Sequence, residues 1–302
     1  MKPKIIIAGG SGFIGQEMAN YFKNRFEIVI LTRNKTENIN EIRFVNWDGK
    51  TFGKWTDELE NALAIINLTG RSVNCRYNEF NKNEIYESRL ASTSIIGKAI
   101  INCKIKPEIW INAASATIYR NEYEQPNTEE KGIIGDGFSV DVCKKWEEKF
   151  YSFKIDNVKQ INLRIAIVLQ KDKSVMIPFK NLAKLGLGGK AATGKQLFSW
   201  IHITDFCSAI DFLIHKNNAV GTYNLASPNA ITNSCFMKKI RSKMGIPFGI
   251  PQPKWLLEIG AWIIKTETEL IVKSRWVYPA RLLSEGFKFE YNTIDKAIID
   301  LV

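Results

Sequence analysis

Short runs of consecutive apolar residues, separated by segments of helical length, constrain the fold of this chain more than any other feature. Because the runs are apolar at successive positions and not at alternate ones, the strands they form must be buried on both faces. Strands of this kind that are joined through helices form a parallel sheet with helices on both sides. The strand runs are KIIIAGG, EIVILTR, EIRFVNW, LAIINLTG, EIWINAAS and QINLRIAIVL, and the helical segments include GQEMANYFKNRF, SRLASTSIIGKAIINCK and VDVCKKWEEKFYSFK. The sequence therefore predicts a doubly wound α/β fold.

A glycine-rich turn follows the first predicted strand, in the stretch IIIAGGSGFIG at residues 5 to 15. Glycines recur there at every third residue, between a strand over residues 5 to 8 and a helix that begins near Phe13. Glycine lets a pyrophosphate approach the backbone, and the first N–H groups of the helix attract it. Any tight turn favours glycine, but a position directly after the first strand favours a dinucleotide site. The residues predicted to hold the cofactor are Gly9, Ser11, Gly12, Phe13, Ile14 and Gly15.

Arg33 stands at the end of the second predicted strand, in the stretch EIVILTRN. A site for NAD(H) places a carboxylate there for the ribose 2′-hydroxyl, whereas the 2′-phosphate of NADP(H) needs a cation. Asn34 and Lys35 follow Arg33, and the first acid is Glu37. The sequence therefore predicts NADP(H) in preference to NAD(H), with Arg33 and Asn34 among the cofactor contacts. The alternative is an exposed loop arginine that binds no ligand.

The pattern changes after residue 170, where the glycine-rich LGLGGKAATGK precedes WIHITDFCSAIDFLIH and a strand-like GTYNLAS. Thr204 or Asp205 can cap the helix in the second of these stretches. Clustered prolines, two helical patterns and a short GFKFEYN stretch then lead to a last helix. We therefore expect a Rossmann dinucleotide-binding domain over residues 1 to 228, with segments after 170 on the substrate side. A smaller α+β subdomain is expected over residues 229 to 302.

A formal net charge of +11 favours anionic partners such as phosphorylated cofactors, although a basic surface can also be merely solvated. The basic residues are spread along the chain and form no recognition helix, so we expect no nucleic-acid partner and leave a homodimer open.

Five scattered cysteines without a C-x-x-C pair argue against a disulfide framework and a zinc site. No apolar run reaches the ~18 residues of a membrane span, and no signal peptide is recognisable. These features predict a soluble, cytoplasmic protein.

The glycine turn, Gly9-Gly10-Ser11-Gly12-Phe13-Ile14-Gly15, resembles the G-x-x-G-F-I-G opening of the extended short-chain dehydrogenase/reductases, the NAD-dependent epimerase/dehydratase superfamily. Further blocks resemble an epimerase-like bacterial branch with its own C-terminal module. They are INLTG at 66 to 70, CRYNEFNKNEIYESR ending at Arg89, ASATIY at 114 to 119, LGLGGKAATGKQLFSWIHITD, YNLASPNAITN and YPARLLSEGFKF. The resemblance spans essentially the whole chain. It implies that Thr69 and Gly70 line the adenosine or pyrophosphate side of the cofactor.

The same resemblance implies a hydride transfer to or from nicotinamide, in which a tyrosine moves a proton, a lysine four residues later lowers its pKa, and a serine orients the substrate. Ser115 matches the serine. No Tyr-x-x-x-Lys pair occurs in the following helix, and alignment on Glu147 puts Ser139 and Cys143 at the two positions. A serine hydroxyl ionises too weakly to replace the phenol. Tyr119 is left as a proton donor, a substrate contact or a packing residue.

The run NCRYNEFNKNEIYESR follows the fourth strand and so begins at the ligand-binding edge of the sheet. Arg76 and Arg89 are predicted to bind an anionic substrate, although charged helical faces are often only solvated. The GLGGKAATGK segment is a candidate lid. His202 is predicted to be a hydrogen-bonded core residue and His215 a helix terminus, so neither a metal site nor a Ser-His-Asp triad is expected.

Two functions remain open. The first is an NADP(H)-dependent oxidoreductase or epimerase-like enzyme that acts on a small anionic carbonyl or sugar compound, oriented by Ser115. The second is a catalytically silent protein whose NADP(H)-bound state regulates a partner. The full-length C-terminal module favours the first, and the missing Tyr and Lys favour the second.

Overall fold

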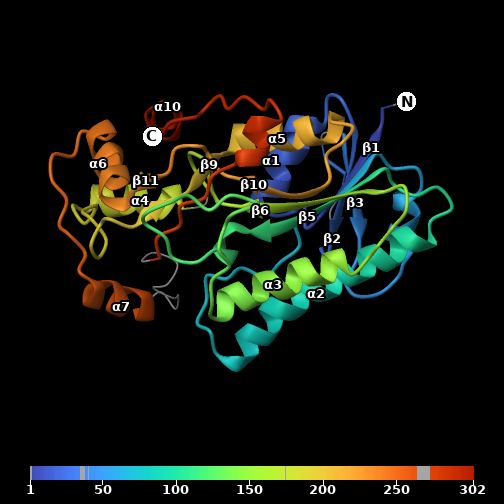
Figure 1. The fold of residues 1–302 in the computed structure, drawn as a ribbon, viewed down its shortest axis with the longest axis horizontal. Helices are drawn as coiled ribbons and strands as arrows, with labels where there is room; N and C mark the ends of the chain where they lie inside the picture. Colours follow the sequence, from blue (N-terminus) through green and yellow to red (C-terminus); the bar gives the residue numbers. More distant parts are fainter. Residues whose placement is uncertain (1, 35–37, 40, 174, 264–272) are drawn as a thin grey trace.

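A parallel sheet of seven strands lies at the centre of the protein (Figure 1). The computed structural model describes residues 2–34, 38–39, 41–173, 175–263 and 273–302. The strand order is β10-β6-β5-β4-β1-β2-β3, so the chain starts in the middle of the sheet and winds outward in both directions, as predicted. The strands of this sheet are β1 (Lys4–Ala8), β2 (Glu27–Thr32), β3 (Ile42–Asn46), β4 (Ala64–Asn67), β5 (Ile109–Ser115), β6 (Lys159–Ile165) and β10 (Gly221–Leu225).

Both faces of the sheet are covered by helical elements, which are α1 (Phe13–Phe22), η1 (Lys54–Leu59), α2 (Glu79–Asn102), η2 (Ala116–Ile118), α3 (Phe138–Tyr151) and α5 (Ile203–His215). Helices α1 and α5 cover one face, and α2 and α3 cover the other (Figure 1). Along β1, Ile5 and Ile7 pack into the first of these cores, while Ile6 and Ala8 pack into the second. These four successive positions are apolar because their side chains fill two cores. Within the described residues, no helix combines the length and apolarity needed to cross a bilayer.

A separate apolar core lies at the C-terminal end of the molecule and contains side chains such as Met176, Phe236 and Leu301. The elements of this region are β7 (Ile167–Leu169), α4 (Met176–Lys184), β8 (Leu197–Phe198), β9 (Trp200–His202), β11 (Ile231–Thr232), α6 (Asn233–Lys243), α7 (Lys254–Ile263), α9 (Ala280–Ser284) and α10 (Ile294–Leu301). Strand β7 pairs with β9, and β8 pairs with β11. Because α4 precedes residue 229, this core draws on both sides of the predicted domain boundary.

His202, and not Thr204 or Asp205, supplies the side-chain cap of α5. The Thr204 backbone N–H donates to Nδ1 of His202 over 3.2 Å. The Asp205 carboxylate instead accepts the backbone N–H groups of Glu290 and Tyr291 at 2.8 and 2.9 Å, which ties the segment before α10 to α5. The predicted cap was therefore wrong, because a carboxylate next to a helix start was recruited by a distant backbone.

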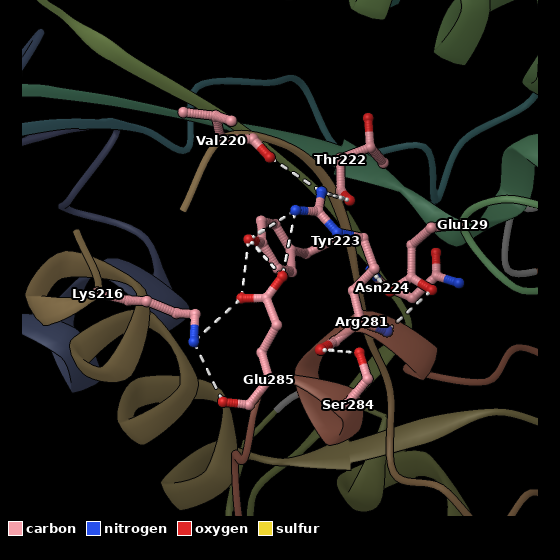
Figure 2. Close-up of polar contacts among 9 residues, drawn as sticks. All are labelled: Glu129, Lys216, Val220, Thr222, Tyr223, Asn224, Arg281, Ser284 and Glu285. Atoms are coloured by element: carbon pink, nitrogen blue, oxygen red, sulfur yellow. Dashed lines mark hydrogen bonds and ion pairs between the residues drawn. The ribbon is translucent and has the colours of Figure 1, made fainter. Parts of the chain in front are cut away.

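Arg281 joins the C-terminal module to the outermost strand β10 (Figure 2). Its guanidinium lies 3.9 Å above the Tyr223 ring and donates to the backbone oxygens of Val220 and Thr222, both at 2.9 Å. It also donates to the Tyr223 hydroxyl at 2.9 Å and to Glu285 at 3.2 Å. One side chain from α9 thus satisfies two backbone acceptors and one buried phenol.

We expect Arg281→Met to lower the free energy of unfolding by about 2 kcal/mol, because hydrogen bonds to a charged group contribute roughly 1.5–3 kcal/mol and this side chain is partly exposed. Urea unfolding followed by circular dichroism measures the change. Ser284→Ala is the matched control on the same helix, since its exposed hydroxyl donates to the Arg281 carbonyl within α9 and to no other group among the described residues. Equal stability of the two variants would contradict a stabilising role for the guanidinium.

Candidate functional site

A cavity of about 590 Å³ opens where the carboxyl ends of β1, β2 and β4 meet. The strand order reverses on either side of β1, so the loops diverge there and leave room for a ligand. The cavity is lined by Gly9, Ser11 and Gly12, by residues 31–33, 47–50 and 68–72, and by Glu84, Glu87, Ser88 and Ala91 of α2. The glycine turn and the end of the second strand, far apart in sequence, therefore form one site.

The glycine turn has the tight geometry that its spacing predicts. Gly9 adopts a φ of +75°, which side chains rarely tolerate, and its N–H donates to the Leu31 carbonyl at 3.2 Å. A Cβ on Gly15 would lie 2.4 Å from the Gly10 Cα, so the turn closes only with glycine at position 15. Gly12 is the N-cap of α1 and has no side-chain cap. The backbone at the amino end of α1 thus borders the cavity and offers the donors that a pyrophosphate requires.

Thr69 and Gly70 line the same cavity from the end of β4. The Asn67 side-chain oxygen accepts the Thr69 backbone N–H at 3.1 Å and so fixes the turn after the strand. Among the described residues, nothing hydrogen-bonds the buried Thr69 hydroxyl. An unsatisfied hydroxyl beside a cavity fits a site whose ligand supplies the partner.

The turn after β3 contributes residues that the sequence analysis did not single out, namely Trp47, Asp48, Gly49 and Lys50. The Asp48 carboxylate accepts the Lys50 and Thr51 backbone N–H groups at 2.7 and 2.8 Å. Hydrogen bonds from the Thr51 hydroxyl and these N–H groups lower the pKa of Asp48 to about 2. The sequence signal that could have identified this turn is the pair Asp48-Gly49, which follows a strand ending at the ligand-binding edge of the sheet. Arg33 is exposed and also lines the cavity, so two cations border this end of it.

Four residues predicted to contact the cofactor do not line the cavity: Phe13, Ile14, Gly15 and Asn34. The first three are the opening residues of α1. The Asn34 backbone N–H donates to the Thr32 hydroxyl at 3.3 Å. The contact of these four residues with a ligand stays a prediction, whereas the close approach of Gly15 to Gly10 shows its part in the turn.

Ser115 ends β5 and accepts the Thr117 backbone N–H at 3.2 Å. The buried thiol of Cys143, on α3, interacts with the Ser115 side chain, which slightly lowers the pKa of the thiol. Burial raises the pKa of Cys143 to about 12, so the thiol is neutral at physiological pH. Ser139 lies one helical turn before Cys143 and is 7% exposed. At the two positions where the resemblance implies Tyr and Lys, α3 thus carries the uncharged side chains of Ser139 and Cys143.

Arg89, predicted to bind an anionic substrate, lies beside the cavity but is not among its lining residues. Its guanidinium packs against Gly70 and stacks on the Trp146 ring at 5.0 Å. It donates to the backbone oxygens of Arg71 and Ile85 at 3.1 and 3.0 Å. Burial lowers the pKa of Arg89, and no carboxylate among the described residues forms an ion pair with it. A buried cation therefore lies beside Gly70 at the wall of the cavity, between β4 and the Trp146 ring of α3.

Tyr119 is fully buried. Its hydroxyl lies 2.8 Å from the Asn224 side-chain oxygen and 3.1 Å from the Thr128 carbonyl, and it accepts from Arg164 at 2.9 Å. Because the Tyr119 hydroxyl is enclosed in this way, a packing role is favoured over the roles of proton donor and substrate contact.

The other substrate-side predictions lie away from the cavity. Arg76 is partly buried, and its carbonyl accepts from the Asn81 side chain at 2.8 Å. The candidate lid lies against residues 250–252, where the Ala192 backbone N–H donates to the Gln252 carbonyl at 2.8 Å. Neither Arg76 nor the lid lines the cavity.

Comparison with known proteins agrees with this arrangement. The model of the NAD-dependent epimerase/dehydratase family matches residues 5–133, and a domain of unknown function, DUF1731, matches residues 252–301. The epimerase family protein SH2119 of Staphylococcus haemolyticus is 30% identical over 303 residues, which cover 99% of each chain. The chain belongs to the NAD-dependent epimerase/dehydratase family.

Other members of this epimerase family show the same full-length similarity. The epimerase family protein YfhF of Bacillus subtilis is 27% identical over 99% of this chain and 97% of its own. The human epimerase family protein SDR39U1, in a crystal structure with NADPH, has a TM-score of 0.85 at 24% identity and covers 99% of this chain and 98% of its own. That likeness confirms the fold over the whole length.

Proposed function

We propose that this epimerase-family protein is an NADP(H)-dependent oxidoreductase that acts on a small anionic carbonyl or sugar compound. The observation that carries the proposal is the cavity shared by the glycine turn and Arg33. When bound, the cofactor supplies or accepts a hydride, which is two electrons and one proton nucleus. The NADPH in the human relative's structure supports the choice of cofactor.

The chain's own residues divide the binding between them. Gly9, Ser11 and Gly12 line the cavity at the amino end of α1, where the first N–H groups of the helix and the helix dipole favour two phosphates. Arg33 and Lys50 offer positive charge to the 2′-phosphate. Ser115 orients the substrate carbonyl, and Arg89 attracts its anionic group.

A catalytically silent regulator is the second candidate. The observation that favours it is the pair of uncharged, buried side chains, Ser139 and Cys143, at the Tyr and Lys positions. Such a protein would bind NADP(H) equally well but would not oxidise it.

Titration of the protein with NADPH and with NADH tests the cofactor, with energy transfer from tryptophan to the nicotinamide as the readout. Trp47 lines the cavity and provides a nearby donor. We expect NADPH to bind at least about 10-fold more tightly, since a charged hydrogen bond to phosphate contributes roughly 1.5–3 kcal/mol. We expect Arg33→Asp to reverse this preference.

Lys154→Asp is the matched control, because it makes the same charge change at an exposed residue outside the cavity. It should leave the ratio of NADPH to NADH affinity unchanged. An unchanged ratio in Arg33→Asp would remove Arg33 from the 2′-phosphate site, and no binding of either cofactor would overturn the proposed function.

A further inference from the structure

Tyr77 brings a phenol to α3 from a different part of the chain. It lies between β4 and α2, and its hydroxyl is 3.3 Å from the Ser139 Oγ. Its ring packs against Phe138 with the centroids 4.7 Å apart. In the alignment on Glu147, Ser139 stands at the position where the resemblance implies a tyrosine. A phenol from another element is therefore held beside the position where the family's phenol is missing.

Arg89 provides the charge that is missing at the lysine position. The neutral thiol of Cys143 cannot stabilise a phenolate, but the Arg89 guanidinium interacts electrostatically with both Cys143 and Tyr77. Its stacking on Trp146 and its two bonds to backbone oxygens hold it in place. Arginine stays protonated at neutral pH, so the positive charge persists through a reaction cycle.

We propose that Tyr77 is the proton donor of this protein and that Arg89 takes over the electrostatic role of the absent lysine. The inference rests on the proposed function. In the reducing direction the carbonyl carbon gains the hydride while NADPH is oxidised to NADP⁺, and the carbonyl oxygen takes the proton from the Tyr77 hydroxyl. The product is an alcohol, and the phenolate, stabilised by Arg89, regains its proton from water.

Two other tyrosines near the site are less suited to this role. Tyr119 is fully buried, with its hydroxyl held by Arg164 and Asn224. The Tyr86 hydroxyl donates to Asp141, and both burial and this carboxylate raise the pKa of Tyr86. A raised pKa makes a phenol a weaker acid, so Tyr86 would release its proton less readily than an ordinary tyrosine.

The test measures NADPH oxidation with 9,10-phenanthrenequinone and with a panel of α-keto acids as carbonyl probes, and NADPH binding separately. We expect Tyr77→Phe to lower kcat by about 10²- to 10⁴-fold, the usual contribution of general acid catalysis, with an unchanged Kd for NADPH. The part of the pH dependence of kcat that reflects ionisation of the Tyr77 hydroxyl should disappear in this variant. Tyr86→Phe is the control and should keep both kcat and the profile.

Arg89 is tested as a positioning residue by its conservative variant. We expect Arg89→Met to lower kcat and shift the pH profile, and Arg89→Lys to restore part of both. Full turnover by Tyr77→Phe overturns the assignment. Tight NADPH binding without oxidation by any probe also overturns it and favours the silent regulator, whereas absent NADPH binding refutes the proposed function itself.

Discussion

A Glu147→Gln variant is expected to lose about 3–5 kcal/mol of unfolding free energy, because it leaves the Arg164 guanidinium buried without its counter-charge. The two side chains, each only 11% exposed, join α3 to β6 through paired hydrogen bonds of 2.8 and 2.7 Å. Burial by itself lowers the pKa of Arg164, but the bonds to Glu147 and Tyr119 raise it above its ordinary value. The cation therefore stays charged and depends on its partner.

Chemical unfolding measures this loss, and Glu148→Gln is the matched control. Glu148 is the next residue on α3 but is exposed, so its change should stay within about 0.5 kcal/mol. The double variant Glu147→Leu with Arg164→Met removes both charges and should lose less than Glu147→Gln alone. A single variant as stable as its control would show that Arg164 finds another partner.

The second large effect is expected for Gly15→Ala, which should cost about 3 kcal/mol and abolish tight cofactor binding. The added Cβ would meet the Gly10 Cα at 2.4 Å and the Gly10 carbonyl oxygen at 2.7 Å. Both atoms belong to the backbone of the glycine turn, so relief requires the turn itself to move. Thermal unfolding and the NADPH titration together record the two losses.

Gly12→Ala separates these two effects. A Cβ at Gly12 would make only an ordinary contact of 3.5 Å with the Gly9 carbonyl, but it would project near the cavity that Gly12 lines. We expect a stability loss below about 1 kcal/mol, from the weaker N-cap, together with clearly weaker NADPH binding. If Gly12→Ala bound NADPH normally, the cofactor's phosphates would have to lie elsewhere.

The sequence predicted the sheet because the cause is local. Strands such as β1 carry successive apolar residues that fill two cores, and this run of apolar residues is visible in the sequence without knowledge of the tertiary structure. The glycine turn could also be predicted from the sequence, since the φ of +75° at Gly9 and the close approach of Gly15 to Gly10 both require glycine. The position of Arg33 at the cavity could be predicted because it directly follows the second strand.

Features that join distant segments could not be derived in this way. Tyr77 and Ser139 are 62 residues apart, and nothing in either segment states that they meet. The Asp205 carboxylate looked like a helix cap, but it binds the backbone at Glu290, which only the packing of α10 brings near. The local sequence shows which nearby groups a polar side chain could bind, but the tertiary structure determines which partner it actually has.

The contacts of Arg281 also bear on how copies of this protein can meet. A terminal strand usually presents a row of unpaired backbone groups that another chain can extend. At β10 part of that row is occupied, because Arg281 donates to the Thr222 oxygen and to the oxygen of Val220 just before the strand, and the Glu129 carboxylate accepts the Asn224 backbone N–H at 2.9 Å. A second strand would have to displace Arg281 and Glu129 from these backbone groups, so the two side chains disfavour edge-to-edge pairing through β10.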